Sequence, residues 1–114
     1  MKCMKNSIIL SVLFLCNISV FSQKVFSCEY KSDADVKVYV VQYKSDADLC
    51  VFKVPYKSDA DDNKGLWYFV EYKSDANKKI FFVDYKSDAD LLIYFVDYKS
   101  DAGWRNNARK YLMY

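Results

Sequence analysis

The feature that most constrains this chain is a short motif, Tyr-Lys-Ser-Asp-Ala, which occurs six times in 114 residues. The copies begin at positions 30, 43, 56, 72, 85 and 98, so the spacing is 13 residues except for one step of 16. A fixed period of this kind indicates repeat architecture, in which each unit buries surface against its neighbours. The fold must therefore be built from one short unit used repeatedly.

The segments between the motifs have the composition of strands. Examples are "VKVYVVQY" at 36–43 and "LLIYFVDY" at 91–98. They are rich in β-branched and aromatic residues, about eight residues long, and bounded by polar turn residues. We therefore expect an all-β protein in which each repeat supplies one strand and one turn.

Alternation along a strand predicts which face is buried. Successive side chains point to opposite faces, so each motif Tyr should share a face with the residues two and four positions before it. We expect this face to be the core, which predicts strong destabilisation by Tyr85→Ala and little by Asp62→Ala. The expected core aromatics are Phe26, Tyr30, Tyr39, Tyr43, Phe52, Tyr56, Tyr68, Tyr72, Phe81, Tyr85, Tyr94 and Tyr98.

The opposite face is also apolar, as Ile93 and Phe95 illustrate. Both faces therefore need cover, which favours strands that wind back on one another into a compact, closed or solenoid-like structure. On the view that one unit sends the chain out and the next returns it, two units make one circuit and six units make about three. An antiparallel β-meander is the alternative.

The motif itself is interpreted mainly as architecture, because Ser and Asp side chains stabilise turns through hydrogen bonds to nearby backbone groups. The step of 16 residues places an insertion around Asp61–Gly65, which we expect to bulge outward. Gly103–Tyr114 breaks the period and is predicted to be an irregular cap that packs its aromatic residues on the last strand. A basic binding tail is the alternative for this segment.

The N-terminus has the pattern of a secretory signal peptide. Lys2 and Lys5 precede the apolar run Ser7–Phe21, and small side chains follow near Ser22. We expect a signal peptide at 1–22, a single β domain at 23–114, and a periplasmic or secreted protein. No membrane attachment is expected after cleavage, with an uncleaved anchor as the alternative.

Charge and composition exclude several functions. The chain has 17 basic and 15 acidic residues, and loss of Lys2 and Lys5 with the signal would leave 15 of each. Such a balance offers no long-range field to attract nucleic acid, so we expect no nucleic-acid partner. We also expect a monomer. The absence of histidine removes the usual general base and metal ligand, and two glycines cannot form a phosphate loop. We expect no enzyme activity and no cofactor.

Repeated acid pairs are the most site-like feature. Stacked corners could bring such carboxylates together around Ca²⁺, which takes six or more oxygen ligands. The favoured alternative is that they serve the turn backbone and neighbouring lysines, because the pairs lack the glycine and distal Glu of a calcium loop. The candidate calcium ligands are Asp33, Asp35, Asp46, Asp48, Asp59, Asp61, Asp88 and Asp90.

Two further features leave a choice between binding and structure. The row of tyrosines could stack on sugars or other flat ligands if it were exposed, although burial is the favoured interpretation. Cys28 and Cys50 remain after signal cleavage and could form a disulfide, as an oxidising compartment permits, or could be two buried apolar residues.

The repeated Tyr-Lys-Ser-Asp-Ala-Asp, the stretch "LWYFVEYKSDA" and the closing "GWRNNARKYLMY" resemble a family of short exported bacterial proteins of unknown function built from Tyr-x-Ser-x-Ala-Asp repeats. The resemblance covers residues 25–114. The "FSQ" at the end of the signal is similar to that of exported Bacteroidetes proteins. A small relative is a deeply knotted β structure of the torus type, so the resemblance implies a knotted winding. It supplies no catalytic residues.

Together these features predict an exported, non-catalytic structural or interaction protein of the cell envelope. The alternative is a ligand-binding module that uses its Asp-Ala-Asp corners for Ca²⁺ or its Tyr residues for a glycan.

Overall fold

The computed structural model describes residues 23–60 and 62–114, and the predicted signal peptide lies outside them. Within the described residues, short strands alternate with 3₁₀ turns, one strand and one turn per repeat. The strands are β1 (Lys24–Ser27), β2 (Val36–Val40), β3 (Leu49–Lys53), β4 (Leu66–Phe69), β5 (Lys78–Phe82), β6 (Leu91–Phe95) and β7 (Gly103–Trp104). The 3₁₀ elements are η1 (Lys31–Asp33), η2 (Lys44–Asp46), η3 (Lys57–Asp59), η4 (Lys73–Asp75), η5 (Lys86–Asp88), η6 (Lys99–Asp101) and η7 (Asn107–Met113). The expected all-β repeat fold is confirmed.

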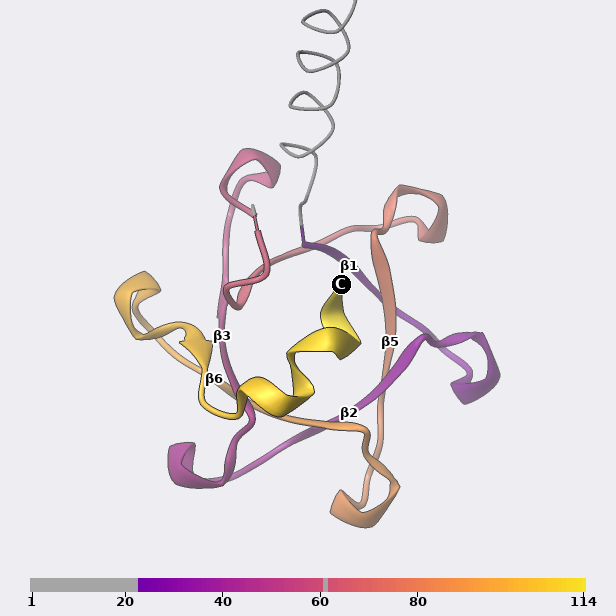
Figure 1. Ribbon diagram of the computed structural model, residues 1–114. Coiled ribbons are helices and arrows are strands. Elements are labelled where there is room, and N and C mark those ends of the chain that lie inside the picture. The colour runs from indigo at the N-terminus through magenta and orange to yellow at the C-terminus, as the bar shows by residue number, and fades with distance from the viewer. Residues whose placement is uncertain (1–22, 61) are drawn as a thin grey trace, which may run out of the picture.

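Six of these strands close into a barrel. Their order is β4-β1-β5-β2-β6-β3, and pairing between β3 and β4 completes the ring (Figure 1). All pairings within the ring are parallel, whereas β7 runs antiparallel along β3. The antiparallel meander is therefore wrong, and the compact closed structure is confirmed.

The strand register explains how so short a unit connects parallel strands. On β5, Lys78–Ile80 pairs with Val25–Ser27 of β1, and Ile80–Phe82 pairs with Val36–Val38 of β2. Thus β2 begins opposite the residue at which β1 ends, one strand farther round the ring. The chain never has to run back along the barrel, so the eight residues 28–35 replace the dozen or more that a parallel crossover usually needs.

This register also corrects the expected number of circuits. Because β5 lies between β1 and β2, and β6 between β2 and β3, these units each advance by two positions round the ring, whereas the step from β3 to its direct neighbour β4 advances by one. About three units complete one circuit, which returns the chain to β4 beside β1, and six units complete about two, so the prediction of two units per circuit is wrong. The turns η1, η4, η5 and η6 contact β5, β1, β2 and β3 respectively, so each passes over a strand of the other circuit.

The six corners share one hydrogen-bonded turn, and only the third leaves it differently, with ψ 66° at Ala60 where the other five are extended. In the first, Tyr30 is extended (φ −121°, ψ 138°), the amide of Asp33 donates to the carbonyl of Tyr30 (3.1 Å), and that of Ala34 donates to Lys31 (3.2 Å). The corresponding bonds recur in every repeat. These are backbone bonds, and within the described chain the Ser32 hydroxyl adds none to them. The expected stabilisation of the turn by its own Ser and Asp side chains is therefore wrong.

The core consists of the residues on the opposite strand face from the one predicted. At the position five residues before each motif Tyr, every side chain is 0% exposed and belongs to one cluster: Val25, Val38, Val51, Trp67, Ile80 and Ile93. Val36, Leu49 and Leu91, two residues earlier in their repeats, complete the packing. The interior of a small closed barrel is thus filled by the β-branched and large apolar residues of this face.

The motif tyrosines are not in the core. Their exposed fractions are Tyr30 63%, Tyr43 63%, Tyr56 69%, Tyr72 64%, Tyr85 70% and Tyr98 70%. The physical reason is that the strands stop before the Tyr: β2 ends at Val40, Val41 is still buried, and by Tyr43 the chain has turned outward. Alternation therefore no longer assigns the Tyr to a face. The other six predicted core aromatics are only half-buried: Phe26, Tyr39, Phe52, Tyr68, Phe81 and Tyr94.

The predicted C-terminal cap closes one end of the barrel. In Figure 1, η7 lies across the opening of the ring, and Met113 is 1% exposed within the core cluster. The buried Gln23 side chain donates to the carbonyl of Met113 (3.0 Å). Trp104 and Leu112 pack against the core, but Tyr111 and Tyr114 are exposed, so only part of the predicted aromatic packing is present.

The inserted loop anchors this cap instead of bulging outward. Asn63 is buried, its amide donates to the carbonyl of Lys110 (3.0 Å), and its oxygens accept from the Trp104 indole (3.0 and 3.1 Å). Gly65 has φ +84°, and a Cβ there would overlap the carbonyl oxygen of Cys50. The extra residues thus hold the cap and allow close packing of the chain against β3.

The other end of the barrel is closed by side chains. Phe69, Phe82 and Phe95 are the last residues of β4, β5 and β6. They are partly buried and pack against the core. The ammonium of Lys53 lies 4.6 Å from the centre of the Phe95 ring and 5.5 Å from that of Phe69. This cation–π arrangement places the charge over the aromatic faces and leaves it exposed to water.

Candidate functional site: the corner rim

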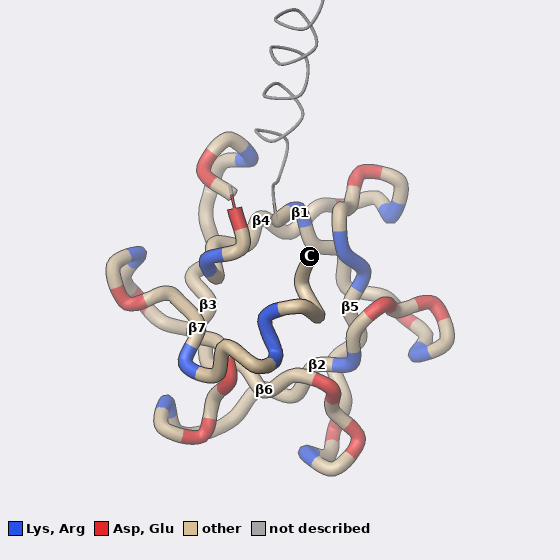
Figure 2. Tube along the Cα trace, viewed as in Figure 1, with Lys and Arg blue, Asp and Glu red and all other residues tan. Residues whose placement is uncertain are grey.

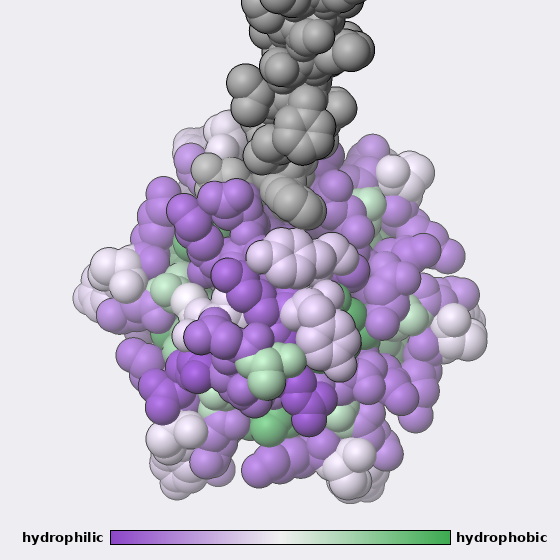
Figure 3. Space-filling view, viewed as in Figure 1, coloured by the Kyte–Doolittle hydropathy of each residue, from purple (hydrophilic) through white to green (hydrophobic). Residues whose placement is uncertain are grey.

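The six motif corners form an outer rim around the barrel, and this rim carries the motif tyrosines and the first acid of each candidate acid pair. Figure 2 shows that each corner projects from the ring and presents Lys and acidic residues side by side. The space-filling view in Figure 3 shows a mainly hydrophilic surface on the capped face. We call the residues from each motif Tyr to the following Ala the corner rim.

The second acid of each pair that the structure describes in full, which follows the motif Ala, ties its corner to a neighbouring strand by hydrogen bonds, and we call such a residue a latch. The amide of Asp35 donates to the carbonyl of Lys79 (2.7 Å), and the Asp35 carboxylate accepts from the amide of Lys79 (3.0 Å). The same reciprocal pair joins Asp48 to Leu92, Asp90 to Lys37 and, with an amide oxygen in place of a carboxylate, Asn77 to Lys24. These side chains therefore tie one circuit of the chain to the other.

In the described corners, the side chain of the first acid of each pair, the motif Asp, forms no hydrogen bond to a neighbouring strand. Asp33, Asp46 and Asp88 are exposed at the ends of their turns and Asp59 is half-buried, while Asp33 lies 3.9 Å from the ammonium of Lys73 on the adjacent corner. The three acid pairs that the structure describes in full, Asp33/Asp35, Asp46/Asp48 and Asp88/Asp90, are thus each divided between a rim position and a latch. Among the described residues no group of three or more acidic, Cys or His side chains is placed to hold a metal ion, and Asp61 lies outside them. The calcium interpretation therefore gains no support from the described acids and stays a prediction.

The two cysteines are separate in the structure. Both Cys28 and Cys50 are buried and carry free thiols, so the possible disulfide between them is not formed. Burial raises the pKa of Cys28, and the nearby carboxylate of Asp33 adds to the effect. A thiol held in its protonated form is a poor nucleophile, which fits the alternative that Cys28 is a small buried apolar residue.

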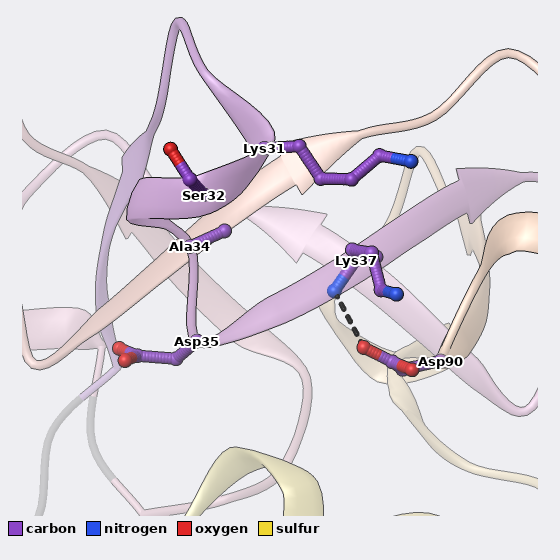
Figure 4. A pocket seen from close by; sticks show the side chains of 6 residues that line it. All are labelled: Lys31, Ser32, Ala34, Asp35, Lys37 and Asp90. Atoms are coloured by element: carbon purple, nitrogen blue, oxygen red, sulfur yellow. Dashed lines mark hydrogen bonds between the residues drawn. The ribbon is translucent and has the colours of Figure 1, made fainter.

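Figure 4 shows a pocket of about 470 Å³ between the first corner and its neighbour. Its lining residues are Lys31, Ser32, Ala34, Asp35, Lys37 and Asp90. Both carboxylates are latches and accept backbone amides, as the dashed bond from Lys37 to Asp90 in the figure illustrates. The pocket therefore offers a ligand two ammonium groups and a hydroxyl beside two carboxylates that are already engaged.

Two smaller grooves lie between other adjacent corners. One, of about 270 Å³, is lined by Lys57, Tyr68, Val70, Glu71, Tyr72 and Asp75. The other, of about 230 Å³, is lined by Lys44, Tyr94, Phe95, Val96, Asp97, Tyr98 and Asp101. Because the motif tyrosines are exposed, their rings are available on these surfaces. The binding interpretation of the Tyr row, disfavoured from the sequence, thus gains support from the geometry.

The residues that join the cap to the barrel were not identified from the sequence. Gln23, Asn63 and Met113 are each at most 6% exposed and connect the cap to the barrel. A polar residue at a core position of the first repeat was the only available signal for Gln23.

Within the described residues, no helix is both long and apolar enough to cross a membrane.

Comparison with known proteins places the fold. No curated protein and no solved structure matches the chain. The family model described as the 7(1) septoil knot domain matches residues 22–105, which span the interleaved circuits from β1 to β7. This match confirms the expectation of a knotted, repeat-built β family, whereas export and bacterial origin stay predictions. The chain belongs to the septoil knot domain family.

Proposed function

We propose that this protein is an exported, non-catalytic interaction protein of the cell envelope, and that the corner rim is its contact surface. The observation that carries the proposal is the exposure of the six motif tyrosines, each at least 63% open to solvent. A Tyr at this exposure adds little to folding stability, yet the rim repeats it six times. Tyrosine is also a residue favoured at interfaces, because it offers a large, rigid and amphipathic contact area.

The rigid barrel supports this role. The interior is tightly packed and each corner is held at both ends, by its backbone turn and, in most repeats, by a latch to the adjacent strand. Side chains on such a frame lose little conformational freedom when they bind. Export rests on the predicted signal at 1–22, and mature protein recovered from the producing cell is expected to begin at Gln23.

The test compares the full chain with a variant in which all six motif tyrosines are replaced by alanine. Both proteins are used to pan a random-peptide display library and a glycan array, after their melting temperatures have established that both are folded. We expect ligands that bind the native rim and not the variant. A failure to recover any ligand, or recovery of ligands that bind both proteins equally, would show that the rim is not the contact surface.

A glycan is the favoured ligand class within this proposal. The exposed rings lie beside carboxylates and lysines in the two small grooves, and these are the groups that bind sugar faces and hydroxyls. The alternative of Ca²⁺ binding has no comparable support from the geometry.

A further inference from the structure

The two small grooves of the rim repeat one set of chemical groups. Each has an exposed motif Tyr, a half-buried Tyr four residues earlier, two carboxylates and one Lys. Tyr72 and Tyr98 are the exposed rings, with exposed fractions of 64% and 70%. The volumes, about 270 and 230 Å³, fall below those of drug-sized pockets, so each groove suits a small ring and not a large ligand.

The lysine of each groove comes from a different corner. Lys57 belongs to η3 while the rest of the first groove comes from β4, η4 and the residues that join them. Lys44 belongs to η2 while the rest of the second groove comes from β6, η6 and the residues that join them. The winding therefore creates these sites by bringing neighbouring corners together, and an isolated repeat would not contain one.

The sequence distinguishes these two repeats from the other four. Only the fourth and sixth repeats combine a Tyr four residues before the motif with an acid directly before it. The first, third and fifth repeats have Phe at the earlier position, and the second follows its Tyr39 with Gln42 before the motif. The full set of groups is thus restricted to the two repeats in which the structure forms matching grooves.

We propose that these two grooves are equivalent subsites for a neutral saccharide with β-linked, equatorially substituted sugar rings; this inference rests on the proposed function of the rim. Such a ring has an apolar C–H face that can stack on Tyr72 or Tyr98. Its hydroxyls can donate to the carboxylates of each groove and accept from the lysine. Two carboxylates against one lysine disfavour an anion, and acceptors and a donor side by side suit a neutral, hydroxyl-rich ligand.

Two subsites on one rigid frame favour a polymer. A saccharide long enough to reach both grooves would bind the second one intramolecularly, so its avidity would exceed the affinity of a short oligomer. Loss of one groove should therefore weaken polymer binding more than it weakens binding of an oligosaccharide to the remaining groove.

The experiment uses the full chain and calorimetric titration with cellohexaose and chitohexaose, followed by affinity electrophoresis in hydroxyethylcellulose. The groove variant is Tyr72→Ala/Tyr98→Ala. Its matched control is Tyr30→Ala/Tyr85→Ala, which removes two motif tyrosines of almost the same exposure, 63% and 70%, from repeats without the full set of groups. Melting temperatures establish that all variants are folded.

We expect at least one hexasaccharide to bind the native chain, with affinity reduced about tenfold or more in the groove variant. The control should bind within about twofold of the native chain, since its grooves are intact. The Glu71→Gln/Asp97→Asn variant should also bind more weakly, because it removes the charged acceptors while keeping their shape.

The inference is overturned if neither hexasaccharide binds the native chain, or if the control loses as much affinity as the groove variant. Failure here is distinguishable from failure of the rim as a contact surface. If peptide or other glycan ligands still depend on the motif tyrosines, the rim remains the contact surface and only the saccharide class is wrong.

Discussion

In the barrel interior, equivalent positions of the repeats carry different side chains, whereas in the corner rim they carry identical ones. Five residues before the motif Tyr, the interior has three different side chains, Val, Trp and Ile, all fully buried. At the rim the same five residues recur in every repeat: the Tyr, Lys and Ser are exposed in all six, whereas the Ala is buried or half-buried. Interior positions share one space and must fill it with complementary volumes. Each corner instead repeats a local turn that makes no such demand.

This difference teaches that identity among repeats does not mark the core. Identical tyrosines looked like a stacked interior, whereas the interior is the part that varies. Trp67 illustrates the reason: its large ring is accommodated in a repeat whose residue two positions earlier is Gly65. A second Trp at each equivalent position would overfill the barrel.

The largest expected effect is from Ile80→Ala. Ile80 is 0% exposed and faces the end of β1 on one side and the start of β2 on the other. Removing its buried methyl groups leaves a cavity in a closed interior and should lower the free energy of unfolding by ~2–5 kcal/mol. Urea denaturation followed by circular dichroism measures this. A loss below about 1 kcal/mol would contradict the core assignment.

Met113→Ala tests whether the cap belongs to the interior. Met113 is 1% exposed and packs in the core cluster, so we expect a loss of ~2 kcal/mol or more. Tyr114→Ala is the adjacent control, since Tyr114 is 58% exposed. Equal melting temperatures for the two variants would show that the barrel does not depend on its cap.

An intermediate effect is expected for the latch. Asp90→Ala removes the acceptor of the Lys37 amide and should cost ~1–2 kcal/mol in the free energy of unfolding. Asp90→Asn should restore most of it, because Asn77 already serves as a latch in the fourth repeat. Asp88→Ala, at the exposed rim position of the same motif, is the control. If Asp88→Ala were as harmful as Asp90→Ala, the division of labour between the two acids would be wrong.

The smallest expected effect is from Tyr85→Ala, in the same repeat as Ile80. Tyr85 is 70% exposed, so its removal should change stability by no more than about 0.5 kcal/mol. This reverses the strong destabilisation expected from alternation alone. Chemical denaturation of the two single variants side by side gives the comparison directly. A Tyr85 variant as unstable as the Ile80 variant would remove the distinction between interior and rim.

Local features of this protein could be predicted well from its sequence. Strand composition and the polar motif located each strand and each turn to within a few residues, and the closed β structure followed from the two apolar faces. The candidate site could be predicted less well from the sequence. Nothing local distinguishes Asp33, which is exposed at the rim, from Asp35, which latches a strand 44 residues away along the chain. The groove lysines likewise come from corners that only the winding brings together.

The sequence by itself determined the repeat unit, because strand and turn preferences act between residues close in the chain. Only the tertiary structure decided which strand face is inside, how many units complete a circuit and which side chains meet at the rim. These depend on register between strands from different circuits, such as Lys37 and Asp90, which are 53 residues apart. Each strand fits between its neighbours by pairing its first half with one and its second half with the other, and this pairing is a property of the closed ring.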